Sequence, residues 1–252
     1  MIPIQGELFK NIEGTSYFHI HEADFSKAKS NVIILHNSDY PVSHALSLHD
    51  NMKIFTENKN IVVFSQNVDI RHERIIALPI GLENSEWFTE LKKQEKIMNL
   101  NKRPLVKTNF CVAKFNTRTH HSRVSVLEYF SKQEWCDSAF TLNGFNFDEY
   151  LNSVGSSTFC VCPRGNGIDT HRLWECLYVK TIPIVESCIN TDNFYAPIIR
   201  VEKFEDVTKE GLEYFLNQLP PQNSQRWFDM FTVATLDFNY WKGLIKENII
   251  EN

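Results

Sequence analysis

A stretch at residues 163–172 combines a glycine loop with three basic side chains, and residues of these types in this order could hold an anion. Arg164 lies in the loop, while His171 and Arg172 fall in the first turn of the helix predicted to follow it. Cations are disfavoured there by roughly 0.3–1 kcal/mol each, because the helix dipole is positive at its N-terminus. A bound anion would explain this placement, since backbone N–H groups and the dipole converge on one point. The sequence therefore predicts a phosphate site, and the alternative is a surface cluster in which His171 and Arg172 pair with Glu175.

The elements around this loop follow from the spacing of apolar residues. Residues 158–162 and 181–185 are short apolar runs that suit buried strands. Between them, apolar residues recur at helical spacing up to about residue 179, and Asp169 is a natural N-cap for that helix. The whole unit is therefore predicted to be strand, loop, helix and strand.

Residues 159–177, FCVCPRGNGIDTHRLWECL, followed by IPIV, resemble the signature of exostosin-like glycosyltransferases. That signature reads approximately PRGxGxDxHRxWEAL and then GxIPIV. The resemblance implies a GT-B enzyme, in which two Rossmann-like lobes enclose a nucleotide-sugar that is held mainly by the second lobe. Lys180 stands where the family usually has glycine, and it would be strained if that turn needs a positive φ.

The resemblance also implies which residues bind the donor. A second basic loop, at residues 114–123, is similar to the family pattern F-N-x-x-T-N-x-x-x-R at Asn116 and Arg123, and loops after neighbouring strands converge on one ligand. For Arg118 and Arg123 the alternative is a solvated turn. Glu175 aligns with the carboxylate that binds both ribose hydroxyls in GT-B enzymes. The predicted donor-binding residues are Asn116, Arg118, Arg123, Arg164, Gly165, Asn166, Gly167, Asp169, Thr170, His171, Arg172 and Glu175.

Inversion at the anomeric carbon, which the resemblance implies, needs a base that takes the acceptor proton. That base should come from the first lobe. Asp39 is the first candidate and His36 the second, because both follow the buried strand at residues 31–35, where open α/β sheets place ligands. Asp39 could instead cap the next helix. Arg172 is the third predicted catalytic residue, because a fixed arginine can stabilise the charge on the leaving group without a metal.

The apolar and turn patterns divide the chain into three parts. The acceptor-side lobe is predicted at residues 1–103, the nucleotide-sugar-binding lobe at 104–221, and a C-terminal helix that packs back on the first lobe at 222–252. Strands are predicted near residues 16–20, 31–35, 61–65, 75–78, 108–113, 139–143, 158–162, 181–185 and 198–201. Helices are predicted at residues 41–55, 84–99, 122–131, 147–153, 170–179, 208–219 and 222–249. The predicted fold class is therefore α/β, with two Rossmann-like lobes in the GT-B arrangement and a crossing C-terminal helix.

Composition excludes several classes of protein. The 252 residues carry a formal net charge of −5 and no long basic run, so neither a nucleic acid nor an anionic membrane is expected as a partner. No signal peptide and no run of about 18 apolar residues is present, so no membrane span is expected. We expect a monomer or weak dimer in the cytoplasm. Short stand-alone members of this kind resemble virus-encoded glycosyltransferases of large DNA viruses, for which the compartment would be the host cytoplasm.

Six cysteines occur without a CxxC pair, so the spacing of a zinc finger is absent. Cys160 and Cys162 should share one face of their strand, and we expect free buried thiols in a reducing compartment. No Asp-x-Asp pair is present, and the second lobe is rich in arginine. We therefore predict donor binding without a metal and no other cofactor.

The leading hypothesis is an inverting glycosyltransferase that moves a sugar from a nucleotide-sugar to a hydroxyl of a glycan. A UDP-sugar is the expected donor, with UDP-xylose among the sugars that relatives use. The alternative is a module that binds a nucleotide or phosphosugar without catalysis. An epimerase is disfavoured, because GxGxxG is missing after the strand at residues 31–35.

Overall fold

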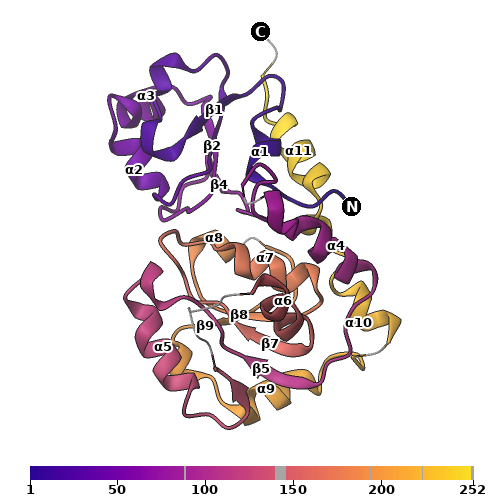
Figure 1. Cartoon of the computed structure of the whole chain (residues 1–252). Coiled ribbons are helices and arrows are strands. Elements are labelled where there is room, and N and C mark those ends of the chain that lie inside the picture. Colours follow the sequence, from indigo (N-terminus) through magenta and orange to yellow (C-terminus); the bar gives the residue numbers. More distant parts are fainter. Residues whose placement is uncertain (88, 140–145, 193, 223, 251–252) are drawn as a thin grey trace.

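Two α/β lobes, each built on a parallel sheet, make up the computed structural model of the chain (Figure 1). The structure describes residues 1–87, 89–139, 146–192, 194–222 and 224–250. The first sheet has the order β1-β2-β3-β4, with strands Ser16–His19, Val32–His36, Val62–Ser65 and Ile75–Ala77. The second sheet has the order β6-β5-β7-β8-β9, and its strands β5 to β9 are Asn109–Val112, Cys136–Asp137, Ser157–Val161, Ile182–Glu186 and Ile199–Val201. The predicted fold class, with two Rossmann-like lobes, is confirmed.

The strands read as apolar runs because parallel sheets are covered on both faces. All five residues of β2 and all five of β7 are buried. Cys160 in the central strand β7 lies opposite Val112 on one side and Pro183 on the other. The segments after β2, β3 and β4 hydrogen-bond to the segment after β7, so the carboxyl ends of the two sheets face each other.

Helices connect the strands in both lobes. The α-helices α1 to α11 are Gly6–Phe9, Val42–Ser47, Asn51–Glu57, Lys93–Lys102, Ser122–Phe130, Phe147–Gly155, His171–Tyr178, Ile189–Asp192, Lys209–Leu216, Gln225–Asp229 and Phe238–Lys246. Short 3-10 turns lie at Ile20–Glu22, Phe25–Lys27, Thr89–Leu91, Thr117–Thr119, Phe204–Asp206 and Ala234–Leu236. Among the described helices, none combines the length and the apolar character that crossing a membrane requires.

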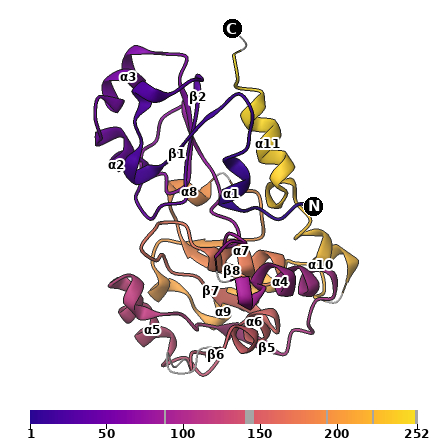
Figure 2. The same cartoon turned by 45° about the horizontal axis from the view of Figure 1, so that its top comes forward.

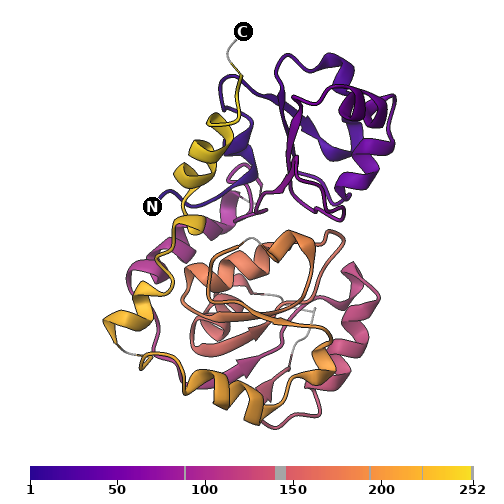
Figure 3. The same ribbon diagram turned by 180° about the vertical axis from the view of Figure 1, so that it is seen from behind.

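The chain ends by returning to the first lobe, as predicted. Views from two further directions place α11 beside α1 (Figures 2 and 3). Phe238 packs against Phe9 with ring centroids 5.3 Å apart. Further along, the side chain of Asn31 donates to the carbonyl of Asn248 at 2.8 Å. The C-terminal segment therefore packs on the first lobe, against α1 and the residue that precedes β2.

Three predicted helices have other bounds. The helix expected at residues 41–55 is two helices, α2 and α3, because the chain turns at His49, whose φ is 48°. The helix expected at 84–99 begins only at Lys93. The helix expected at 222–249 is divided into α10 and α11, with an irregular segment between them. In each case the apolar spacing continues in the sequence through a segment where the α-helix is interrupted or absent in the structure.

Other predicted elements shift more modestly. The strand expected at 139–143 falls mostly outside the described residues, and the strand observed in this region is β6 at Cys136–Asp137. The segment between β8 and β9 contains the short helix α8. Lys180 does have a positive φ, of 64°, as the missing glycine suggested.

Helix α4 connects the lobes and packs on the second one, although it lies within the segment 1–103. The side chain of Asn101 donates to the carbonyl of Tyr178 at 2.9 Å. Lys96 pairs with Asp148 of α6 at 2.7 Å. The predicted boundary between the lobes, at residue 103, therefore lies after the chain has crossed to the second lobe.

Candidate functional site

The loop between β7 and α7, residues 162–170, is held against the first lobe by Asn67, which lies two residues after the end of β3. The Asn67 Oδ1 atom accepts hydrogen bonds from the backbone N–H groups of Ile168, at 2.9 Å, and Asp169, at 3.0 Å. A Cβ atom added at Gly167 would lie only 2.9 Å from the Asn67 Nδ2 atom. The glycine is therefore required by the close approach of the two lobes at this point.

Asp169 does not cap α7, which corrects the prediction. The N-cap of α7 is Thr170, which makes no side-chain capping bond. The Asp169 carboxylate is buried and accepts from the Trp174 Nε1–H at 3.0 Å and from the Ile80 N–H of the first lobe at 2.8 Å. Burial raises the pKa of Asp169 to about 6, although the hydrogen bonds from Ile80 and Trp174 favour its ionised form. Asp169 thus joins the lobes.

Because the pKa of Asp169 rises from its ordinary 3.8 to about 6 in the folded protein, stability should depend on pH through this group. The stabilisation is fully present below about pH 4 and is lost as the pH rises through about 6, because the folded state holds the proton more tightly. We expect the difference in unfolding free energy between the wild type and Asp169→Asn to fall by up to about 3 kcal/mol between pH 4 and pH 7. Urea unfolding of both proteins across this range measures it. A constant difference would contradict the expectation.

His171, predicted to bind the donor, forms a second link between the lobes. Its Nδ1 atom donates to the carbonyl of Gly81 at 2.8 Å in the tautomer that this acceptor selects. Gly81 has a φ of 71°, which favours glycine. Within the described chain, neither His171 nor Arg172 forms an ion pair with Glu175 within 4.0 Å, so the predicted alternative of a surface cluster is wrong.

The backbone N–H groups of the loop are mostly used within the protein. Those of Ile168 and Asp169 bind Asn67, and that of Thr170 binds the Asp169 carboxylate at 2.8 Å. The N–H of Gly165 donates to the carbonyl of Gly167 at 3.1 Å. These glycines and Thr170 therefore shape the loop, and an anion here would depend on the side chains more than on the predicted backbone cradle.

Arg123 also has a structural task that the sequence did not indicate. From α5, its guanidinium donates to the carbonyls of Arg164 at 2.6 Å, Pro163 at 3.0 Å and Asn116 at 2.9 Å. Burial, and to a smaller extent the positive charge of Arg172, lower its pKa to about 10. Arg123 therefore fastens the two basic loops together, and its donors are directed at carbonyls and not at open space.

Arg172 lies at the start of α7, with its guanidinium 4.9 Å from the ring centroid of Tyr150 and 5.9 Å from that of Phe115. Its Nε and Nη1 atoms are enclosed and have no hydrogen-bond partner, while the side chain as a whole is partly exposed. Glu175, one turn further on, is buried and accepts from the Tyr150 hydroxyl at 2.7 Å. The three side chains form a compact polar cluster between α6 and α7.

Arg164 faces a cavity of about 370 Å³ between the lobes. The cavity lies at the carboxyl ends of β7, β8 and β9, the edge at which parallel sheets bind ligands. Burial raises the pKa of Glu186 in its wall, and the charge of Arg164 opposes that change. Three of the predicted donor-binding residues lie in the wall, namely Arg164, Asp169 and Thr170. The wall also contains residues that were not predicted, among them Asp69 of the first lobe and Glu186, Ser187 and Glu202 of the second.

The two predicted bases of the first lobe have different surroundings. Asp39 is exposed, and its Oδ2 atom accepts from the side chain of Asn166 in the β7–α7 loop at 3.2 Å. It does not cap α2, whose N-cap is Pro41. Instead, Asp69 accepts from the N–H of Ser43 in the first turn of α2, at 3.0 Å. Asp39 therefore faces the second lobe with its carboxylate accessible.

His36 cannot serve as the acceptor base in this structure. It is fully buried, its Nε2 atom is 3.0 Å from the carbonyl of Pro79, and its Nδ1 atom accepts from the N–H of Asn37 at 2.9 Å. Burial lowers its pKa to about 4, so the ring is neutral. The predicted role of His36 is therefore replaced by a structural one, in which it supports the turns after β2 and β4.

The second basic loop is only partly directed at the site. Asn116 accepts from the N–H of Arg118 at 2.9 Å and caps a 3-10 turn, and the Arg118 side chain is exposed. The structure thus gathers Arg164, Arg172 and Asp39 around the β7–α7 loop and leaves Arg118 at its margin. The structure also places two residues at the candidate site that were not predicted there, Asn67 and Tyr150. Asn67 was recognisable as a polar residue at a strand end, whereas no sequence signal marks Tyr150.

Comparison with known proteins gives little support for a particular family. No family model matches the chain, and no curated protein sequence matches it significantly. Among solved structures, the crystal structure of an α1,3-fucosyltransferase is similar at 14% sequence identity and a TM-score of 0.40. The match covers 86% of this chain and 78% of that chain. Because the similarity is this distant, the activity of that enzyme is not transferred to this protein.

Proposed function

We propose that the protein is a glycosyltransferase that moves a sugar from a nucleotide-sugar to a hydroxyl of a glycan, with inversion at the anomeric carbon. The resemblance of residues 159–177 to exostosin-like enzymes supports the class. A UDP-sugar is the proposed donor, and UDP-xylose is one of the sugars to test. The second lobe would hold the donor, and the first would present the acceptor.

One observation carries the proposal. Arg164 lines a cavity at the carboxyl ends of three parallel strands, and Arg172 lies in the first turn of α7, where the β7–α7 loop ends. In the described residues neither forms an ion pair with a carboxylate within 4.0 Å, and each has an enclosed nitrogen without a hydrogen-bond partner. Buried charge without a partner is costly, so an anion that compensates it is favoured. A diphosphate carries that charge and is a good leaving group when arginines stabilise it.

Thermal shift with a panel of nucleotide-sugars tests donor binding first. A ligand present at 100 times its Kd should stabilise the protein by about 2.7 kcal/mol. The nucleotide-sugar that stabilises the protein is then incubated with and without glycan acceptors, and release of nucleoside diphosphate is measured. Transfer that survives EDTA would support the proposed binding without a divalent metal. Binding without any turnover would favour the non-catalytic module, and no binding would contradict both.

Glu175→Ala should weaken the binding of nucleoside diphosphate by roughly 1.5–3 kcal/mol, because one carboxylate can accept from both ribose hydroxyls. Titration calorimetry with UDP measures the change. Tyr150→Phe is the matched control, since it removes the hydrogen bond to the Glu175 Oε2 atom and keeps the carboxylate. If Glu175→Ala binds UDP as tightly as the wild type, Glu175 only supports Tyr150 and Arg172.

A further inference from the structure

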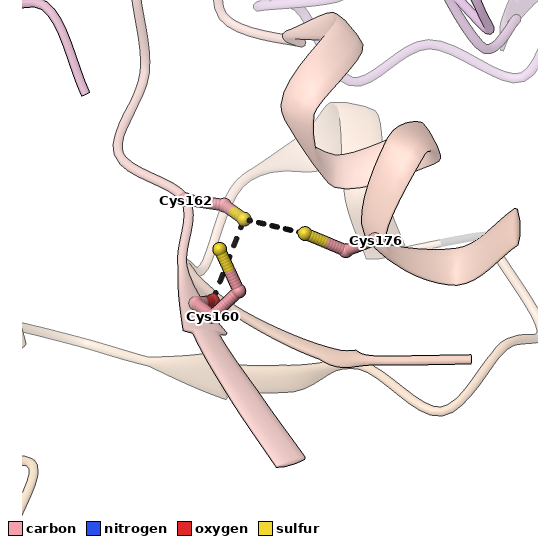
Figure 4. A group of neighbouring side chains, drawn as sticks. All are labelled: Cys160, Cys162 and Cys176. Atoms are coloured by element: carbon pink, nitrogen blue, oxygen red, sulfur yellow. Dashed lines mark hydrogen bonds between the residues drawn. The ribbon is translucent and has the colours of Figure 1, made fainter. Parts of the chain in front are cut away.

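Three cysteine thiols meet beneath the β7–α7 loop, on the side of β7 that α7 covers (Figure 4). Cys160 lies in β7, Cys162 follows it, and Cys176 is on α7. Their sulfur atoms all lie within 4.8 Å of one another, and those of Cys162 and Cys176 are 3.6 Å apart. The exposed fractions of the three residues are 0%, 3% and 0%, and all three are free thiols.

The arrangement follows from the two secondary structures. Residues two apart in a strand point to the same face, so Cys160 and Cys162 both face α7. Figure 4 shows the three sulfur atoms directed toward one another, from the strand and from the helix. A metal ion with bonds of about 2.3 Å to three sulfur atoms would hold them about 4 Å apart. The cluster is therefore close to the geometry that such an ion requires.

Basic side chains lie on two sides of the cluster. The Arg172 Nε and Nη1 atoms are enclosed without a hydrogen-bond partner, and the charge of Arg172 acts on Cys160 and Cys162. On another side, the buried Lys107 Nζ atom donates to the Thr181 hydroxyl at 2.8 Å. Two basic side chains thus lie next to three thiols.

We propose that Cys160, Cys162 and Cys176 form a binding site for one Cu(I) ion. Three S–H bonds break, three Cu–S bonds form and three protons leave, with no change in oxidation state. The three thiolates and the ion carry a net charge of −2, and the basic side chains of Arg172 and Lys107 lie nearby.

Thiolate ligands select soft ions, above all Cu(I) and Zn²⁺. A structural Zn²⁺ takes four protein ligands, and among the described residues no fourth Cys, His, Asp or Glu ligand joins the three. This favours Cu(I). Since Cys162 also lines the cavity between the lobes, the ion has a route to the site. A bound ion would join β7 to α7 and so fix both ends of the loop that carries Arg164.

The full chain, reduced and kept anaerobic, is loaded with Cu(I) in the presence of a competing Cu(I) chelator, and retained copper is measured by elemental analysis after gel filtration. We expect one copper per chain, a higher melting temperature, and three sulfur neighbours in the copper X-ray absorption spectrum. Cys160→Ser and Cys176→Ser should retain none. Cys111→Ser is the matched control and should retain one, because Cys111 is equally buried and lies opposite Cys136 in the same sheet.

Absence of retained copper in the wild type would overturn the proposal. Copper retained equally by the two serine variants would do the same. Preferential retention of Zn²⁺ would overturn the assignment to a three-ligand ion. The absorption spectrum needs only the wild type, so the test stands even if a serine variant does not fold. None of these measurements uses a nucleotide-sugar, and the result is therefore independent of the proposed transferase activity.

Discussion

Replacing Arg172 with alanine is expected to lower kcat by on the order of 10²-fold or more, with a smaller effect on donor binding. Negative charge builds on the leaving diphosphate as the glycosidic bond breaks, so a fixed cation stabilises the transition state more than the ground state. The structure places the Arg172 guanidinium at the start of α7, against the Tyr150 ring and without a carboxylate partner within 4.0 Å among the described residues. The group is therefore held in position and its charge is available.

Two further variants separate charge from packing at this site. Arg172→Met keeps an apolar stem beside Tyr150 and removes the charge, so its kcat should fall as far as that of Arg172→Ala. Arg172→Lys should recover little, because a point charge does not reproduce the planar fork of a guanidinium. Initial rates at saturating donor, together with melting temperatures, measure both effects. If Arg172→Met retains wild-type turnover while Arg172→Ala melts early, Arg172 is a packing residue and the proposed leaving-group site is lost.

The fold could be predicted from the sequence because its signal is local. Runs such as VIIL, IVVF and IPIV are apolar throughout, which indicates parallel strands buried on both faces. Open α/β sheets bind ligands at the carboxyl ends of their strands, and the segments after β2 and β7 meet there through the hydrogen bond between Asp39 and Asn166. The positive φ at Lys180 was also local, because it followed from one missing glycine.

The site was predicted less well, because its geometry depends on contacts between distant residues. Aspartate is a residue type that often caps helices, yet the Asp169 carboxylate accepts hydrogen bonds from Trp174 and from Ile80. Ile80 lies 89 positions away from Asp169 in the chain. His36 and Asp39 are three residues apart and equally suited to catalysis by type, but one is fully buried and the other exposed. Cys176 meets Cys160 only once α7 has packed on β7. Residue type restricts the possible chemistry, and burial selects among the candidates.

Asp39→Asn is expected to lower kcat/KM for sugar transfer by roughly 10²–10⁴-fold, the usual contribution of a general base. Asp39 is the exposed candidate of the first lobe, and its carboxylate already reaches Asn166 in the loop between the two basic residues Arg164 and Arg172. An asparagine there still offers an oxygen to the Asn166 side chain, so the contact between the lobes is kept. The substitution removes the ability to take the acceptor proton and little else.

Two matched variants assign the effect to the base itself. Asn166→Ala breaks the hydrogen bond to Asp39 and keeps its carboxylate, so transfer should fall by much less than in Asp39→Asn. Asp24→Asn alters a carboxylate of the same lobe that accepts from Ser26 in the turn Phe25–Lys27, and it should lower the melting temperature more than the rate. Acceptor-dependent transfer and donor hydrolysis are measured for each variant. Because the proton is taken from the acceptor, Asp39→Asn should retain donor binding while transfer is lost. Full transfer by Asp39→Asn would place the base elsewhere, and His36 could not replace it, since both of its ring nitrogens are engaged inside the first lobe.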